Sequence, residues 1–374
     1  MSGIYFHIPY CQHACTYCNF HFSTSLKTKS AVLGAMKKEM EIRSTSWEDE
    51  LSTIYFGGGT PSILTPTEFS DLIIALGDNF DLSKVEEFTI ECNPEDLVDD
   101  KLEAWKKAGV TRLSIGIQSF QDPILKTINR HHTAEEAIAG VERARKFYFE
   151  NISLDLIVGL PGLSNELLRK DLDQLLALDL EHISVYQLTL EEKTQLAHQV
   201  KKGEVELLSD DVINQQYLLT HEILSNNGFD HYEISNYSKP GFTAVHNSSY
   251  WKGISYLGIG PGAHSFRDNE RIWNVANNIG YTNAIEKGDP WYEGENLEVK
   301  DQFNEFIMIS LRTKEGLNLN EMKSKFPSLY SDELEINIDN WVVNKLAFYD
   351  DINVKLTLKG WLISDDLASD LFVL

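Results

Sequence analysis

The sequence predicts an α/β protein with a parallel sheet covered by helices, followed by a smaller and mainly helical region. Three observations carry this prediction. Strand-like and helix-like segments alternate six times, 42% of the 374 residues are hydrophobic, and a stretch rich in charge, Pro and Gly separates the last part. The alternation fits an open sheet or a full or partial barrel with helices on the outside.

The expected strands are short runs of β-branched and aromatic residues, and the expected helices carry apolar residues at helical spacing. The strands cover residues 4–7, 53–56, 87–91, 112–116, 153–157 and 182–187. The helices cover residues 29–45, 66–79, 97–108, 133–148, 165–178 and 209–227. Two helix starts carry capping signals: Thr65 precedes Pro66, and Glu136 stands three residues after Thr133.

Residues 286–300 mix charge, Pro and Gly, and they predict a linker between a first domain, 1–285, and a second domain, 301–374. Helices followed by a hairpin near the end of the chain predict a winged-helix-like unit without a basic face for DNA. The second domain is expected to contain, in order, a helix over 301–313, two shorter helices, a strand-like segment over 347–358 and a final helix from Lys359.

Acidic residues outnumber basic ones by 57 to 33, which leaves a formal net charge of −24. A surface this negative repels phosphate backbones and anionic lipid, so we expect no nucleic-acid partner. The first residues show no signal-peptide pattern, and no apolar run approaches the ~18 residues that span a bilayer. We therefore expect a soluble, cytoplasmic protein without a transmembrane segment.

Three of the four cysteines, Cys11, Cys15 and Cys18, stand close together directly after the first expected strand. In a reducing compartment, thiols at such spacing hold a metal or carry out redox chemistry. Structural zinc generally needs four ligands, whereas three thiolates on a four-iron cluster leave one iron open for an external ligand. Cys92 stands alone after the third expected strand, and we expect it to be a buried filler rather than a fourth ligand.

Polar or glycine-rich residues also follow other expected strands. Catalytic groups of parallel βα folds gather at the carboxyl ends of the strands, so these residues are candidates for one shared site. The run 57–60, Gly-Gly-Gly-Thr, would bring exposed backbone N–H and C=O groups close to a zwitterionic ligand, although a tight turn explains glycines equally well. The other strand ends carry Glu91, Gln118 and Asp155.

The spacing Cys-x3-Cys-x2-Cys after a first strand resembles the signature of the radical S-adenosylmethionine (SAM) superfamily. This resemblance implies a partial (β/α)6 barrel of the TIM type, and a 4Fe–4S cluster on Cys11, Cys15 and Cys18 whose fourth iron is chelated by SAM. The glycine run is similar to the GGGTP element that contacts the SAM amino group. The resemblance implies SAM contacts from Tyr5, Tyr17, Gly58, Gly59, Thr60, Glu91, Gln118, Arg130 and Asp155. The alternatives are a surface ion pair for Arg130 and a loop cap for Asp155.

Longer motifs, such as those at 114–120 and 155–161, are similar to the branch related to oxygen-independent coproporphyrinogen III oxidase. The likeness runs through nearly the whole chain, including the C-terminal domain. The oxidase has a further cysteine two positions after the third and a longer segment before the cluster. Here Phe20 takes that position and Cys11 comes almost at once, which counts against porphyrinogen decarboxylation.

A further motif resembles the H-N-x-x-Y-W element of the HemW heme chaperones, in which the histidine is a heme-iron ligand. Imidazole can bind ferric iron, and flat amphipathic rings suit a porphyrin. An ordinary buried histidine beside aromatic residues is the alternative. The resemblance implies heme contacts from His246, Asn247, Tyr250 and Trp251.

The sequence thus predicts a heme chaperone that carries a SAM-coordinating cluster and passes heme to an acceptor protein, with no catalytic residue assigned. The expected partners are heme, an acceptor such as a respiratory protein, and a second copy of the chain. The alternative is an enzyme, an oxygen-independent coproporphyrinogen III dehydrogenase that oxidatively decarboxylates two propionates with SAM, and a third option is a radical enzyme for an unrelated substrate. Among the other histidines, we expect His131 and His132 in a solvated loop and His7 and His264 along the cofactor pocket.

Overall fold

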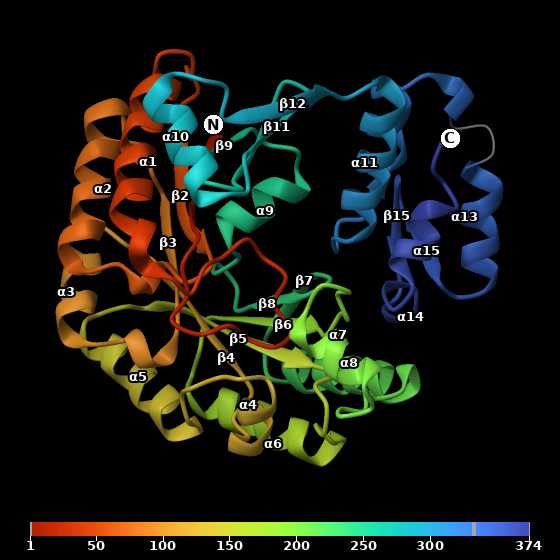
Figure 1. Ribbon diagram of the computed structural model, residues 1–374. Coiled ribbons are helices and arrows are strands. Elements are labelled where there is room, and N and C mark those ends of the chain that lie inside the picture. The colour runs from red at the N-terminus through yellow and green to blue at the C-terminus, as the bar shows by residue number, and fades with distance from the viewer. Residues whose placement is uncertain (1, 331–333, 374) are drawn as a thin grey trace.

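A computed structural model describes residues 2–330 and 334–373, and it shows six parallel strands in chain order at the centre of one large sheet (Figure 1). The strands are β1 (Ser2–Ile8), β2 (Leu51–Gly58), β3 (Glu87–Cys92), β4 (Arg112–Gln118), β5 (Asn151–Val158) and β6 (His182–Gln187). Each contains one of the expected strands. The predicted α/β fold with a mostly parallel sheet is therefore confirmed.

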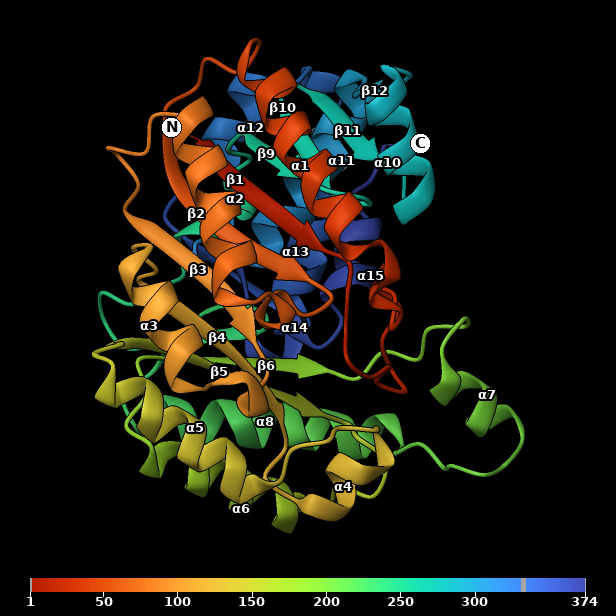
Figure 2. The same ribbon diagram turned by 60° about the vertical axis from the view of Figure 1, so that its left-hand side comes forward.

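Helices follow the strands and cover the outside of the sheet, as the predicted alternation requires (Figure 2). The long helices are α1 (Lys29–Ser44), α2 (Pro66–Asn79), α3 (Asp99–Lys107), α5 (Ala134–Lys146), α6 (Asn165–Ala177) and α8 (Asp210–Asn226). Both predicted capping signals are real, because Thr65 and Thr133 each form a capping box with the glutamate three residues later. The loops carry α4 (Asp122–Thr127), α7 (Gln195–Lys201) and short 3-10 helices at Leu26–Thr28, Pro61–Ile63, Pro94–Asp96 and Ser328–Tyr330.

Alternation along the strands separates an apolar outer face from a polar inner face. On the outer face, Phe6 of β1 stacks on Phe56 of β2 with ring centroids 4.3 Å apart, and Phe56 packs against Phe69 of α2. On the inner face, hydroxyl, imidazole and carboxyl groups point into the curve of the sheet and bond to one another. Apolar packing between the outer face of the sheet and the helices stabilises the barrel. The polar inner face is therefore available for a ligand-binding site.

Further strands extend the sheet at both ends, and the curved sheet stays open because β7 and β12 are the two ends of the strand order. Beyond β6 lie the antiparallel β8 (Asn236–Ser238) and β7 (Asp230–Glu233). Beyond β1 lie β9 (Tyr256–Ile259), which is parallel to β1, and the antiparallel β10 (His264–Arg267), β11 (Glu270–Asn274) and β12 (Tyr292–Asn296). Helix α10 (Asn278–Lys287) packs on α1, and helix α9 (Val245–Trp251) contacts β2. The expected partial barrel is thus present with strands that the sequence did not predict.

The C-terminal region forms a second hydrophobic cluster beside the barrel (Figure 1). Tyr217 of α8 belongs to this cluster and so connects it to the barrel. Within the expected linker, residues 292–296 form β12 of the large sheet, and the division into two domains stays a prediction. The region contains α11 (Val299–Leu311), α12 (Leu319–Lys325), α13 (Leu334–Val343), α14 (Leu358–Trp361), α15 (Ser364–Ser369) and a small sheet in the order β13 (Leu317–Asn318), β15 (Asn353–Leu356), β14 (Ala347–Asp350).

Across residues 2–330 and 334–373, none of the helices has both the length and the apolar character that crossing a bilayer requires.

Candidate functional site

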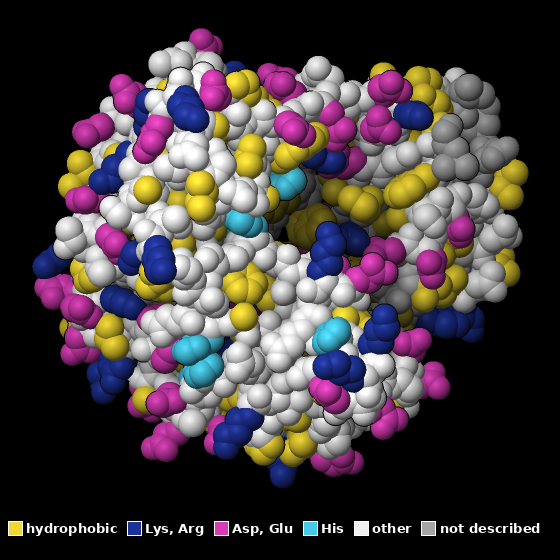
Figure 3. Space-filling model, in the orientation of Figure 1, with side chains coloured by type: hydrophobic (Ala, Val, Ile, Leu, Met, Phe, Trp, Pro, Cys, Tyr) yellow, Lys and Arg dark blue, Asp and Glu magenta, His cyan; other side chains and the backbone are white. Residues whose placement is uncertain are grey.

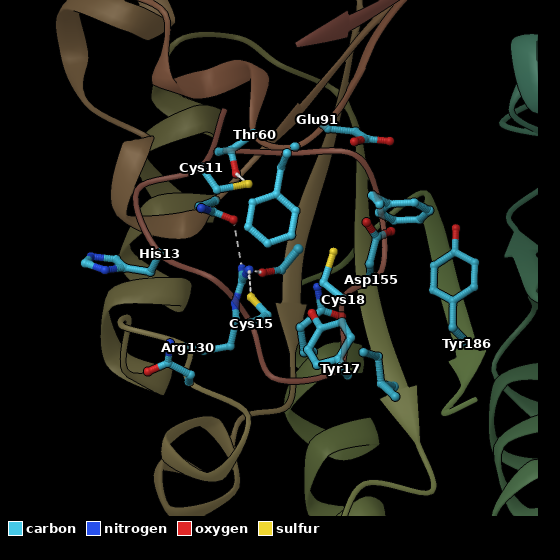
Figure 4. A pocket seen from close by; sticks show the side chains of 18 of the residues that line it. Cys11, His13, Cys15, Tyr17, Cys18, Thr60, Glu91, Arg130, Asp155 and Tyr186 are labelled. Carbon is cyan, nitrogen blue, oxygen red and sulfur yellow. Dashed lines mark hydrogen bonds between the residues drawn. The ribbon is translucent and has the colours of Figure 1, made fainter. Parts of the chain in front are cut away.

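A cavity of about 430 Å³ opens at the carboxyl ends of the parallel strands, within the size range of small-molecule sites (Figure 4). All three clustered cysteines line it. Eight of the nine predicted SAM residues line it as well, although they come from six separate segments of the chain. The members of both sets that line the cavity are Cys11, Cys15, Cys18, Tyr17, Gly58, Gly59, Thr60, Glu91, Gln118, Arg130 and Asp155.

The loop after β1 carries the cysteines around one side of this cavity. The loop is tied down at its base, where the Cys11 N–H donates to Ser23 O at 3.1 Å. Two side chains reach its sulfurs: the Thr60 hydroxyl lies 3.3 Å from Cys11 Sγ, and Arg130 Nη1 lies 3.6 Å from Cys15 Sγ. No three His, Cys, Asp or Glu side chains of the described residues are close enough together to hold a single metal ion.

Burial sets the protonation of the thiols. It raises the pKa of Cys11 to about 11 and also raises the pKa of Cys18, because the charged thiolate loses its hydration in the cavity. A metal centre reverses this effect by binding the thiolate directly. Hydrogen bonds from Thr60 and Arg130 further stabilise negative charge on the sulfurs.

The glycine run after β2 packs against the cysteine loop. The N–H of Gly59 donates to Ile8 O at 2.9 Å, and the N–H of Thr60 donates to Tyr10 O at 2.8 Å. A Cβ on Gly59 would lie 2.8 Å from Tyr10 O, so only glycine allows this approach. The expectation that this run presents free backbone N–H groups is therefore wrong for Gly59 and Thr60, because both donors are used to hold the cysteine loop against the sheet.

Two carboxyl groups lie on neighbouring parts of the inner face. Glu91 accepts a hydrogen bond of 2.7 Å from Tyr55 OH, and Asp155 accepts one of 3.2 Å from Ser114 Oγ. Burial, together with the neighbouring Asp155, raises the pKa of Glu91 to about 7, and burial raises the pKa of Asp155 to about 6. At neutral pH both groups can accept hydrogen bonds from hydroxyl or ammonium groups of a ligand.

Arg130 lies in the cavity wall, so the alternative of a surface ion pair is wrong. Its guanidinium donates to Asn93 Oδ1 at 2.9 Å and to Gly116 O, in addition to Cys15 Sγ. Its Nε is buried and has no hydrogen-bond partner among the described residues. A buried donor without a partner indicates a position where a ligand acceptor belongs.

Tyr5 is the one predicted SAM residue that does not line the cavity. Its hydroxyl lies 3.2 Å from His7 Nδ1, and its ring stacks on Tyr55 deeper in the barrel. Sequence reasoning also missed cavity residues, including Ser114 and Tyr186. For Ser114 a signal was present, since it stands four residues before Gln118 on the same strand and therefore shares its face.

The predicted heme residues lie on α9, outside the cavity. The His246 ring is 2% exposed, and both of its nitrogens have partners: Nδ1 lies 2.7 Å from Thr53 Oγ1, and Nε2 lies 2.9 Å from Tyr250 OH. Burial lowers the pKa of His246 to about 3, so the ring is neutral. Asn247, Tyr250 and Trp251 are half-buried beside it.

Tyr55 connects this helix to the cavity. Its hydroxyl donates to Glu91, and its ring stacks on His246 with centroids 5.0 Å apart. Cys92, expected to be a filler, is buried at the end of β3, where its thiol donates to Ser114 O at 3.7 Å.

The expectations for the remaining histidines need correction. His131 is exposed and stacks on His13, but His132 is buried, with Nε2 3.2 Å from Ile117 O, so it does not lie in a solvated loop. Neither His7 nor His264 lines the cavity. His7 is buried, and both of its ring nitrogens are hydrogen-bonded, one to the Tyr5 hydroxyl and the other to the backbone carbonyl of His21.

Known proteins resemble this chain over most of its length. Residues 5–175 match the sequence profile of the Radical SAM superfamily. The heme chaperone HemW of Lactococcus lactis is 35% identical over 98% of this chain and 96% of its own length. HemW of Bacillus subtilis is 36% identical over 90% of this chain and 88% of its own length.

Among solved structures, coproporphyrinogen III oxidase (HemN) from Escherichia coli matches with a TM-score of 0.86 at 22% identity. The match covers 100% of this chain and 90% of that chain, and it shows a shared fold. Because the likeness to the HemW proteins extends over almost the full length of both chains, this chain belongs to the HemW family within the radical SAM superfamily.

Proposed function

We propose that this chain is a heme chaperone that carries a 4Fe–4S cluster and SAM at the ends of the parallel strands. The cavity itself carries the cofactor part of the proposal, because three thiols, two carboxyls and an unpartnered guanidinium N–H share one space. Membership of the radical SAM superfamily implies the same two cofactors. The heme part is supported by the relatives, which are named heme chaperones.

The chemistry of the donor set fits a cluster bound through Cys11, Cys15 and Cys18. The three are sulfur ligands, which iron–sulfur clusters prefer, and two of them accept hydrogen bonds that stabilise thiolate charge. When bound, the reduced cluster supplies an electron that can cleave the SAM sulfonium.

The rest of the cavity fits SAM. Arg130 would pair with the carboxylate of SAM, because its unused Nε offers a charge-assisted hydrogen bond there. Glu91 and Asp155 would accept hydrogen bonds from the ribose hydroxyls or the amino group. These residues bind and orient the nucleotide, and none of them is assigned a step of chemistry.

Anaerobic reconstitution tests the cluster. We expect wild type to hold about four irons and four inorganic sulfides per chain, and the triple variant Cys11→Ala, Cys15→Ala, Cys18→Ala to hold none. Cys92→Ala is the matched control and should retain the cluster. Zinc without sulfide in wild type, or an intact cluster in the triple variant, would overturn the assignment.

For heme, we propose that His246 binds the iron through Nε2 once Tyr250 OH has moved away from that atom. Heme titration of wild type, followed by the Soret band, should give saturable binding that His246→Ala weakens. Tyr250→Phe removes the competing hydroxyl and should strengthen it. His198→Ala, which changes an exposed histidine on α7, should behave as wild type. Equal binding by wild type and His246→Ala would reject this ligand.

The chaperone role further requires delivery of the heme to an acceptor protein, and we place this exchange in the cytoplasm, with a second copy of the chain as a partner. Heme-loaded protein should restore oxidase activity to respiratory membranes from heme-depleted cells, and heme-free protein should not.

The alternative activity is tested separately. Anaerobic incubation of the reconstituted protein with coproporphyrinogen III and SAM should leave the porphyrinogen unchanged, because Phe20 stands where the oxidase has a further cysteine. Formation of protoporphyrinogen would show an enzyme instead of a chaperone.

A further inference from the structure

His264 is an exposed histidine without a hydrogen-bond partner on the inner side of the sheet. It is the first residue of β10, and neither of its ring nitrogens bonds to any other part of residues 2–330 and 334–373. It lies near His7 of the inner face, whose pKa the charge of His264 lowers. It also lies near Arg271 of β11, whose charge lowers the pKa of His264. In contrast, His246 and His7 each have both nitrogens occupied.

A row of aromatic rings leads from α9 to the strand that carries His264. Tyr250 contacts Tyr256 of β9 edge-on, with centroids 4.7 Å apart, and Tyr256 lies 6.5 Å from Phe266 of β10. Phe266 stands two residues after His264 in the same strand, so the two side chains share one face. All three rings are half-buried, so part of each is open to solvent.

Helix α11 lies against this part of the sheet. Glu305 of α11 accepts a hydrogen bond of 2.6 Å from Arg271, which places this side of the helix against the inner face of the sheet extension. Met308 and Ile309 follow three and four residues later, so they lie on the same side of the helix, and both are half-buried. Figure 3 shows that the molecule is hollowed between the barrel and the C-terminal helices, with hydrophobic side chains gathered on the C-terminal side.

An imidazole without a hydrogen-bond partner, a row of aromatic rings and one side of α11 therefore meet around Arg271, whose charge acts on His264 and Tyr256 and whose guanidinium donates to Glu305. Partial burial of the His264 ring, together with the charge of Arg271, lowers its pKa, which keeps the ring neutral and its nitrogen lone pair available for a metal. A flat apolar macrocycle with an iron at its centre fits this set of groups, because the rings contact its surface and the imidazole reaches the metal.

We propose that His264 is a ligand of the heme iron in this hollow, and that it can bind without any prior rearrangement. The assignment rests on the proposed heme function and adds a ligand on a different element. Coordination uses a nitrogen lone pair of the neutral ring, so no proton or electron is transferred. His246, by comparison, must first lose its bond to Tyr250.

The test is a heme titration of the full-length protein, with His264→Ala, His246→Ala and His198→Ala measured beside wild type. His264→Ala should weaken heme binding at least about 10-fold and shift the Soret band away from that of a histidine-ligated heme. Exogenous imidazole at millimolar concentration should restore the wild-type spectrum, because it can occupy the space that the side chain has left. His198→Ala should match wild type.

A substitution that keeps a metal-binding side chain separates ligation from folding. His264→Met should retain heme with the altered spectrum of a methionine ligand, while circular dichroism stays that of wild type. If His264→Ala and wild type have the same affinity and spectrum, the ligand assignment is wrong, although heme binding and the proposed chaperone function stand. If wild type itself binds no heme, both the proposed function and the ligand assignment are wrong.

Discussion

Glu91 connects the cavity at the strand ends to the buried aromatic groups behind it. Its carboxyl lines the cavity and accepts a hydrogen bond from Tyr55, whose ring lies on His246. Burial raises its pKa to about 7, whereas the ordinary value is 4.5. Between these two values the folded chain keeps a proton that the unfolded chain releases, so this group lowers stability as the pH rises through that range.

Glu91→Gln should therefore stabilise the cofactor-free protein at pH 8, by ~1–3 kcal/mol, because it removes the charge and keeps an acceptor for Tyr55. At pH 4 the advantage should vanish, since Glu91 is then protonated in both states. Urea denaturation at the two pH values measures this. The exposed control Glu142→Gln should show no such difference, and an E91Q protein less stable than wild type at pH 8 would contradict the assignment.

Arg130 is held by three different acceptors, Asn93, Gly116 and Cys15, which only a planar guanidinium can contact together. Arg130→Lys keeps the charge but loses this geometry and the free Nε. We expect SAM affinity to fall ~10–100-fold, as loss of a charge-assisted hydrogen bond of about 1.5–3 kcal/mol requires. Equilibrium dialysis with labelled SAM measures it. Arg143→Lys on α5 is the control, and unchanged SAM affinity in R130K would exclude this contact.

At the scale of elements, one buried carboxylate fastens α1 to the extension of the sheet. Glu39 is fully buried and accepts hydrogen bonds from Gly260 N–H, the Asn274 amide, Tyr281 OH and Trp291 Nε1, at 2.6 to 3.0 Å. These donors come from the loop after β9, from β11, from α10 and from the segment before β12. This single side chain of α1 therefore connects four parts of the extension, which also carries His264.

Glu39→Ala should destabilise the protein by about 3 kcal/mol or more, because four buried donors lose their acceptor at once. Its effect should be measured by chemical denaturation and by the accessibility of Trp291 to a fluorescence quencher. Glu41→Ala, an exposed change on the same helix, should stay within about 0.5 kcal/mol of wild type. A Glu39→Ala protein as stable as the control would show that the donors find other acceptors.

At the scale of the whole molecule, two hydrophobic clusters lie side by side under a strongly acidic surface. The formal net charge of −24 destabilises a compact shape through self-repulsion, which dissolved salt screens. Backbone hydrogen bonds join the barrel to the C-terminal region, as between Ile234 N–H and Arg312 O at 3.0 Å. Repulsion among the acidic side chains should therefore affect the stability of both parts together.

Raising NaCl from about 10 to 200 mM at pH 8 should therefore raise the midpoint of thermal unfolding, because the Debye length falls from about 30 Å to under 10 Å. At pH 5, where part of the acidic charge is neutralised, the same change of salt should have a smaller effect. Calorimetry under the four conditions measures both. A midpoint that falls with salt at pH 8 would show that ion pairs outweigh the net repulsion.

Local patterns in the sequence predicted the six parallel strands, the helices between them and most residues of the cavity. Strand alternation and capping boxes depend on residues a few positions apart, and strand ends of a parallel sheet meet at one edge whatever the details of packing. The short strands β7 to β12 were not predicted, because such strands depend on pairing with distant parts of the chain.

By itself, the sequence determined the fold class, the three-cysteine loop and the family, since these follow from spacing along the chain. Only the tertiary structure decided which polar atoms are free to bind a ligand. The Nδ1 atom of His246 is already hydrogen-bonded to Thr53, which stands 193 residues earlier in the chain. The N–H groups of Gly59 and Thr60 are hydrogen-bonded to carbonyl groups at the start of the cysteine loop. Arg130 Nε and the ring of His264 have no such partner among the described residues. Packing brings hydrogen-bond donors and acceptors together from distant parts of the chain, so a pattern of neighbouring residues does not predict which polar atoms are paired.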